Sequence, residues 1–132
     1  MTPKDLKILV AEDNLVNQMV IGKIFKKLEI HMDLAKDGFE ASEKGQSGAY
    51  DLILMDVNMP GKDGLEVTQE IRQALGDKPI IIALTASVMQ QDQDECIQAG
   101  MNDFMSKPIN REQIIGALNK WFEGIVPLKE AQ

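Results

Sequence analysis

The sequence predicts an α/β protein in which five helices cover a doubly wound, five-stranded parallel sheet. Two observations lead to this fold class. Strand-like apolar runs alternate with segments of helical periodicity, which is the order of elements in such folds. The runs are also almost continuously apolar, as expected of a sheet that is buried on both faces. Right-handed crossovers between parallel strands then restrict the topology.

Each predicted element has its own signal in the sequence. Apolar runs place the strands at residues 6–11, 32–35, 51–55, 80–84 and 103–106. Helical periodicity places the helices at residues 14–28, 37–47, 64–75, 88–99 and 111–122. The first three helices follow cap or turn residues at Asp13-Asn14, Asp37-Gly38 and Asp63-Gly64. Glycines stand where the third and fourth helices should end, at Gly76 and Gly100.

Length and composition indicate one domain, which we expect at residues 6–123, with short tails at 1–5 and 124–132. A net charge of −7 excludes the basic footprint of a nucleic-acid-binding protein. The apolar runs are far shorter than the roughly 20 residues that a membrane helix needs. No apolar signal region follows the amino terminus. The single cysteine, Cys96, fits a reducing compartment, so we expect a cytoplasmic monomer that binds neither nucleic acid nor membrane.

Charged or hydroxyl residues follow four of the predicted strands. Glu12 and Asp13 follow the first, Asp56 the third, Thr85 the fourth and Lys107 the fifth. The carboxyl ends of parallel strands form one rim of the sheet, where ligands bind in such folds. These five side chains are therefore expected to meet in one site.

The chemistry of these residues predicts a metal-assisted phosphoryl acceptor. Three adjacent carboxylates repel one another, and a hard cation such as Mg²⁺ together with Lys107 would balance their charge. Asp56 is a candidate nucleophile, because a carboxylate can form an aspartyl phosphate. Lys107 would stabilise the phosphoryl oxygens during transfer. Thr85 offers a hydroxyl that can donate to one of them.

Four segments resemble the receiver domains of two-component response regulators, at residues 10–14, 55–60, 84–86 and 104–108. The resemblance implies a flavodoxin-like sheet of strand order 2-1-3-4-5 and makes Asp56 the phosphoacceptor. It further implies that Mg²⁺ binds Asp13 and Asp56 directly, Glu12 through water, and the backbone carbonyl of Asn58. Lys107 would pair with the phosphoryl group, and the Lys107–Pro108 bond would be cis.

The resemblance also implies a partner and a switch. The phosphoryl group would come from the phosphohistidine of a histidine kinase or a histidine-phosphotransfer domain. The domain would catalyse its own phosphorylation and its slow dephosphorylation. Thr85 and Phe104 would then reshape the face around the fourth helix, fifth strand and fifth helix, although many relatives have Tyr in place of Phe104. Residues 12–14, followed by Val16-Asn17-Gln18, are similar to the corresponding part of receivers that are attached to hybrid sensor kinases.

The first helix carries a candidate docking patch. Helical periodicity predicts one inward apolar face, made up of Val16, Val20, Ile21, Ile24 and Leu28. Leu15 and Met19 fall nearly opposite, so they should be exposed beside the rim, and Gly22 leaves room for close approach. Exposed apolar pairs of this kind are typical of binding surfaces, and a helical phosphotransfer partner would fit here.

Three alternative functions fit the sequence less well. A flavodoxin-like cofactor binder needs a donor-rich loop after its first strand, where this chain has Glu12 and Asp13. A metal-dependent phosphatase with an aspartate nucleophile needs an acid two residues later, where this chain has Asn58. A receiver-like binding module without phosphotransfer would not need the complete set of site residues.

Overall fold

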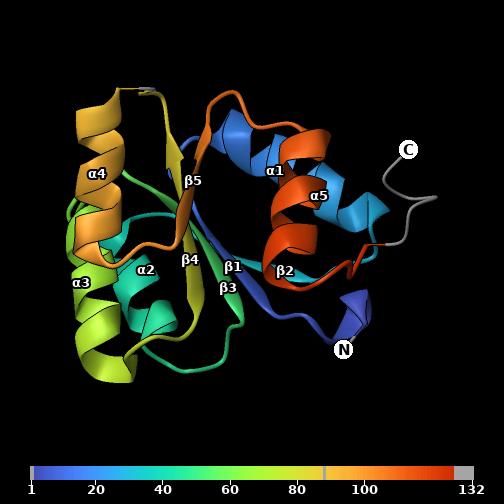
Figure 1. The fold of residues 1–132 in the computed structure, drawn as a ribbon, viewed down its shortest axis with the longest axis horizontal. Coiled ribbons are helices and arrows are strands. Elements are labelled where there is room, and N and C mark those ends of the chain that lie inside the picture. The colour runs from blue at the N-terminus through green and yellow to red at the C-terminus, as the bar shows by residue number, and fades with distance from the viewer. Residues whose placement is uncertain (1, 88, 127–132) are drawn as a thin grey trace.

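The computed structural model describes residues 2–87 and 89–126, and these form a parallel sheet with helices on both faces (Figure 1). The strand order is β2-β1-β3-β4-β5, which confirms the predicted fold class and topology. The strands are β1 (Ile8–Ala11), β2 (Met32–Ala35), β3 (Leu52–Asp56), β4 (Ile80–Thr85) and β5 (Asp103–Ser106). They are all parallel to their neighbours.

The helices lie close to their predicted positions. They are α1 (Leu15–Lys27), α2 (Gly38–Gly45), α3 (Gly64–Leu75), α4 (Gln90–Ala99) and α5 (Arg111–Trp121). The side chains of Asn14, Asp37, Asp63 and Asn110 each accept a backbone N–H in the first turn of the helix that follows. The described helices include none with the length and apolar character needed to cross a membrane.

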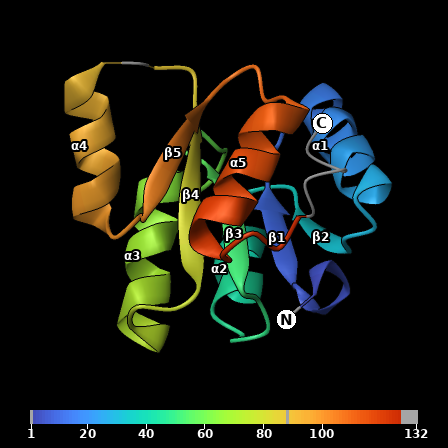
Figure 2. The same cartoon turned by 45° about the vertical axis from the view of Figure 1, so that its right-hand side comes forward.

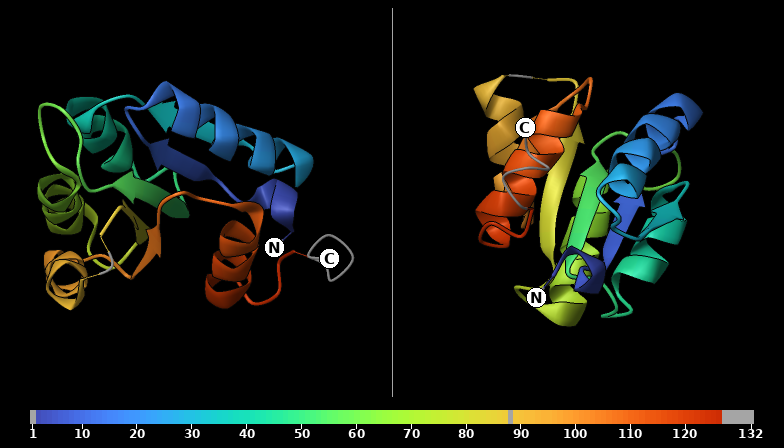
Figure 3. Two further views of the ribbon diagram at one scale, coloured as in Figure 1. Left: turned by 90° about the horizontal axis from the view of Figure 1, so that it is seen from above. Right: turned by 90° about the vertical axis from the view of Figure 1, so that its right-hand side faces the viewer.

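The sheet separates two apolar clusters. Seen from above, α1 and α5 cover one face, and α2, α3 and α4 cover the other (Figure 3). Figure 2 shows α1 and α5 together on their shared side of the sheet. Alternate strand residues point to opposite faces, so Ile8 and Val10 join the α1–α5 cluster, whereas Leu9 and Ala11 join the other. Every residue of β1 and β3 is buried, which explains their continuous apolar runs.

The prediction for the inward face of α1 was partly wrong. Ile21 and Leu28 are buried as expected, and Phe25 lies between them. Val16 and Val20, however, are 66% and 41% exposed. The cause is that the first turns of α1 lie over the sheet rim. There the inward positions are held by Asn17 and Gln18, which contact Glu12.

Both chain ends take part in more structure than the predicted tails implied. Residues Pro3–Asp5 form a short 3-10 helix. Ile125 and Val126 are buried in the α1–α5 cluster, so the folded part extends at least three residues beyond the predicted limit at 123. Residues 127–132 of the predicted tail lie outside the described residues.

Candidate functional site

The strand register brings the predicted site residues to one rim. Ala11 pairs with Met55, so Glu12 and Asp56 follow on adjacent strands. Asp56 pairs with Leu84, directly before Thr85. Thr85 in turn pairs with Ser106, the residue before Lys107. The four strand ends therefore form a continuous row at the carboxyl edge of the sheet.

Three carboxylates meet at this edge. One oxygen each from Glu12, Asp13 and Asp56 lies within 4.8 Å of the others. Lys107 Nζ lies 3.2 Å from Glu12 Oε2 and 3.1 Å from Asp56 Oδ2. Glu12 and Asp56 are buried, whereas Asp13 is exposed at the mouth of the cluster. The single ammonium thus bridges the two buried carboxylates and leaves the cluster with excess negative charge.

The electrostatics of the cluster follow from burial and crowding. Desolvation, together with the nearby Glu12 carboxylate, raises the pKa of Asp56 from 3.8 to about 6, against the opposing effect of Lys107. Burial alone would lower the pKa of Lys107, but Asp56 and Glu12 outweigh it and raise that pKa above its usual value. Lys107 is thus held in its charged form, and a further cation would favour ionised Asp56.

The oxygen donors fit a hard divalent cation. Oxygen ligands from carboxylates are those that Mg²⁺ prefers, completed by water. Among the described residues, the only polar contact of buried Glu12 Oε2 is the Lys107 ammonium at 3.2 Å, which Asp56 shares. A bound cation or its water would give this oxygen a second partner. Glu12, Asp13 and Asp56 are therefore suited to hold such an ion.

Two side chains that hold Glu12 were missed by sequence reasoning. Asn17 Nδ2 donates to Glu12 Oε1 at 3.3 Å, and Gln18 Nε2 donates to the Glu12 carbonyl oxygen at 2.6 Å. The Asn14 backbone N–H also donates to Glu12 Oε1, at 3.2 Å. The available signal was the pair of amides on the otherwise apolar inward face of α1.

Lys107 is positioned by the backbone around it. The Lys107–Pro108 peptide is cis, as the resemblance implied, and the unpredicted Lys78–Pro79 peptide is cis as well. Lys107 N–H donates to the Thr85 carbonyl oxygen at 2.8 Å, which extends the β4–β5 pairing beyond the strand. Gln113, in the first turn of α5, donates from Nε2 to the Ser106 carbonyl oxygen at 2.9 Å.

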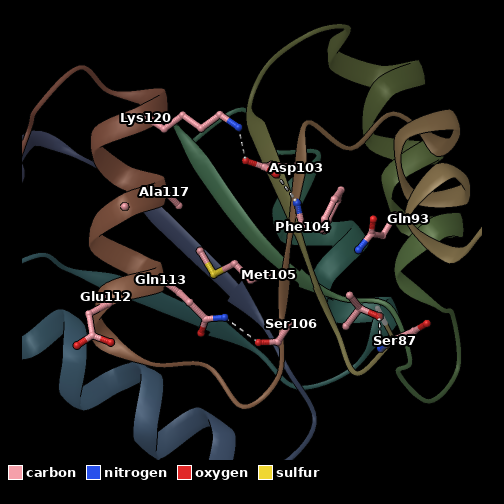
Figure 4. A pocket seen from close by; sticks show the side chains of 12 residues that line it. Ser87, Gln93, Asp103, Phe104, Met105, Ser106, Glu112, Gln113, Ala117 and Lys120 are labelled. Carbon is pink, nitrogen blue, oxygen red and sulfur yellow. Dashed lines mark hydrogen bonds and ion pairs between the residues drawn. The ribbon is translucent and has the colours of Figure 1, made fainter. Parts of the chain in front are cut away.

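Thr85 and Phe104 border a hollow of about 330 Å³ between α4, β5 and α5. Thr85 Oγ1 accepts the Ser87 backbone N–H at 3.0 Å. Figure 4 shows the Phe104 side chain on the α4 side of β5, toward Gln93, and Met105 on the α5 side. Phe104 is only partly buried, so its ring has free space beside it.

The predicted docking patch is larger than expected. Leu15 and Met19 are 72% and 62% exposed, as predicted, and the exposed Val16 and Val20 widen the apolar surface. A Cβ on Gly22 would meet no atom within 4 Å. We define the patch by these five residues, Leu15, Val16, Met19, Val20 and Gly22.

Comparison with known proteins gives a consistent result. The family model described as the response regulator receiver domain matches residues 8–119. The chain is 44% identical over 115 residues to the osmosensing histidine protein kinase SLN1 of Saccharomyces cerevisiae, covering 83% of this chain and 9% of SLN1. The chain spans between 4% and 27% of the length of seven other curated relatives.

Two solved structures are also similar. One is the receiver domain of the sensor histidine kinase PA1611 from Pseudomonas aeruginosa PAO1, with magnesium coordinated in its active-site cleft. It is 42% identical, with a TM-score of 0.81, covering 88% of this chain and 96% of that one. The other is a co-crystal structure of the Saccharomyces cerevisiae histidine phosphotransfer protein Ypd1 with the receiver domain of Ssk1. It is 32% identical, with a TM-score of 0.83, covering 97% of this chain and 95% of that one.

Proposed function

Because this chain belongs to the response regulator receiver domain family, we propose that Asp56 accepts a phosphoryl group from the phosphohistidine of a partner protein. The observation that carries the proposal is the buried Asp56 carboxylate in contact with Lys107 and grouped with Glu12 and Asp13. These residues are those that the transfer needs, and they lie at one rim of the sheet. The partner would be a histidine kinase or a histidine-phosphotransfer domain.

The residues have separate parts in the transfer. An Asp56 carboxylate oxygen attacks phosphorus, the P–N bond to the donor imidazole breaks, and its electron pair stays on the imidazole nitrogen. Lys107 neutralises charge on the phosphoryl oxygens. Asp13, Asp56 and the Asn58 carbonyl would hold Mg²⁺ directly and Glu12 through water. The bound ion would supply charge stabilisation for the phosphoryl group.

Mg²⁺-dependent labelling by acetyl phosphate tests this function without a protein partner. The wild-type chain is expected to gain one phosphoryl group when Mg²⁺ is present and none when it is chelated, as read from intact mass. Labelling that is unchanged when Mg²⁺ is chelated would argue against the metal-assisted reaction. An absence of labelling would favour the binding-module alternative. Neither the flavodoxin-like nor the phosphatase alternative gains support from the site geometry.

Phosphorylation is expected to change the α4–β5–α5 face. Thr85 Oγ1 would leave the Ser87 N–H and donate to a phosphoryl oxygen, and Phe104 would turn into the space that Thr85 vacates. Both residues border the same hollow, which supports their coupling. Beryllofluoride, a phosphoryl mimic, should therefore shift the amide resonances of residues 86–110, and Thr85→Ala should reduce these shifts. Unchanged spectra in the wild-type chain would refute the switch.

The α1 patch is expected to receive the protein donor. Leu15→Ala combined with Met19→Ala removes apolar contact area without touching the cluster, so transfer from a phosphorylated histidine-phosphotransfer domain should slow about tenfold or more. Labelling by acetyl phosphate should be unchanged. Gly22→Gln, which fills open space, should slow the same transfer by obstructing close approach.

A double variant on α4 is the matched control. Met89, the N-cap residue of α4, and Ile97, within α4, are also exposed, at 64% and 47%, but they belong to a different element from the patch. Met89→Ala with Ile97→Ala should leave transfer at the wild-type rate. Equal loss with both donors in the α1 variant, or no loss with either, would rule out the patch. The cytoplasmic location expected from the single cysteine stays a prediction.

A further inference from the structure

The loop after Asp56 rests on the first turn of α2. Residues 57–63 form this loop, which leads from β3 to α3. The Gly38 N–H donates to the Pro60 carbonyl oxygen at 3.3 Å. A Cβ on Gly38 would collide with the Lys62 carbonyl oxygen. Only glycine therefore allows α2 to approach the loop so closely.

Two side chains fasten the loop at its outer end. Phe39 is 60% exposed, yet its ring lies against Gly61, where any Cβ would collide with it. The Lys62 ammonium lies 5.5 Å from the centroid of the same ring, within cation–π range. Lys62 Nζ also contacts both oxygens of Glu70 on α3, at 2.8 and 3.1 Å. Ser42 of α2 donates to Glu70 Oε1 at 2.6 Å, which ties the two helices together.

The other end of the loop belongs to the carboxylate cluster. The Asn58 N–H donates to Asp56 Oδ1 at 3.1 Å, and the Gly64 N–H donates to the Val57 carbonyl oxygen at 2.8 Å. A loop of this length, fixed at both ends, has little freedom in between. Release of its outer end would therefore let Asn58 shift relative to Asp56, which the β3–β4 pairing holds in place. Mg²⁺ tolerates such shifts poorly, because it demands near-ideal octahedral geometry.

We propose that Lys62, held by Phe39 and Glu70, is a positioning residue that fixes the 57–63 loop for cation binding at Asp56. This rests on the proposed function for the identity of the cation. Two effects of losing Lys62 have opposite signs, which makes the proposal testable. Loss of a positive charge would strengthen Mg²⁺ binding by lowering the long-range repulsion of the ion, whereas loss of the loop anchor would weaken it.

Calorimetric titration of the full chain with MgCl₂ separates the two effects. Lys62→Met keeps an unbranched side chain over Phe39 but removes the charge and the ion pair. Its Mg²⁺ dissociation constant is expected to rise about tenfold. Lys62→Arg should restore a value near that of the wild type, because it can pair with both Phe39 and Glu70. Phe39→Ala, which changes no charge, should weaken binding in the same direction.

Lys44→Met is the matched control. Lys44 lies on α2 and pairs with Glu40 at 3.6 Å, with partial exposure comparable to that of Lys62. Its Mg²⁺ dissociation constant should match the wild-type value. Amide hydrogen exchange without metal should quicken at residues 57–59, 61 and 62 in Lys62→Met and Phe39→Ala, but not in Lys44→Met.

An unchanged or tighter dissociation constant in Lys62→Met would overturn the positioning role, as would an equal loss in Lys44→Met. The same holds if the wild-type chain binds no Mg²⁺. These measurements need no phosphodonor. Failure of the positioning role is therefore distinguishable from failure of the proposed function, which labelling of the wild-type chain decides.

Discussion

Asp56→Asn is expected to reduce labelling by acetyl phosphate to background. The amide is a far poorer nucleophile than the carboxylate. Asp56 is buried, ends β3 and contacts Lys107. Intact mass measured with Mg²⁺ present gives the readout. Asp51→Asn is the matched control, since Asp51 immediately precedes the same strand at its opposite end, where it accepts the Lys7 N–H at 2.9 Å. Stable labelling of Asp56→Asn would refute the assignment of the phosphoacceptor.

The same substitution gives a separate result in the metal-free protein. Folding raises the pKa of Asp56 from 3.8 to about 6, so the folded state binds the proton more tightly than the unfolded state. The contribution of Asp56 to the free energy of unfolding therefore falls as pH rises through this window and stays low above it. A pKa change of this size corresponds to a loss on the order of 2–3 kcal/mol.

Asp56→Asn removes this loss, because the amide does not titrate and Lys107 keeps its contact with Glu12. In the presence of a chelator, the melting temperature of the variant relative to the wild type should rise between about pH 4 and pH 7. Other titrating groups largely cancel in the difference. The same difference at both pH values would show that burial does not disfavour ionised Asp56. The same melting curves show whether Asp56→Asn is folded, so they distinguish a loss of labelling from unfolding.

The strands were predictable because both faces of the sheet are covered. The predicted ranges 32–35 and 103–106 match β2 and β5, and β3 and β4 differ by a residue at one or both ends. β1 begins at Ile8 rather than at residue 6, although Leu6 is buried. Apolar runs report burial, whereas a strand also needs backbone pairing. Such pairing cannot be read from one segment alone.

The charged site residues were predictable for a different reason. Parallel strands end at one edge, so a residue that follows a strand has a known place even when its neighbours are remote in sequence. The contacts of Asn17 and Gln18 with Glu12 depend instead on how α1 crosses the end of β1. The exposure of Val16 and Val20 has the same origin. Periodicity gives the angle between residues around a helix, but only packing decides which face of the helix points inward.

Asp13→Ala is expected to abolish the stabilisation of the chain by Mg²⁺. Asp13 is the exposed member of the three-carboxylate cluster, and the proposal makes it a direct ligand. A ligand that binds only the folded state stabilises it by about 2.7 kcal/mol at 100 times its dissociation constant. Melting curves with and without saturating Mg²⁺ should therefore differ for the wild type and coincide for the variant.

Asp13→Ala is also expected to change the stability of the metal-free protein. Removing Asp13 lowers the repulsion within the cluster, so the variant should melt at a higher temperature than the wild type when Mg²⁺ is chelated. Asp94→Ala on α4, which removes another exposed carboxylate outside the cluster, should show neither effect. If Mg²⁺ raised the melting temperature of Asp13→Ala as much as that of the wild type, Asp13 would not be a ligand. Lower metal-free stability would mean that its carboxylate is not repelled, because crowding of three negative charges around one ammonium predicts the opposite sign.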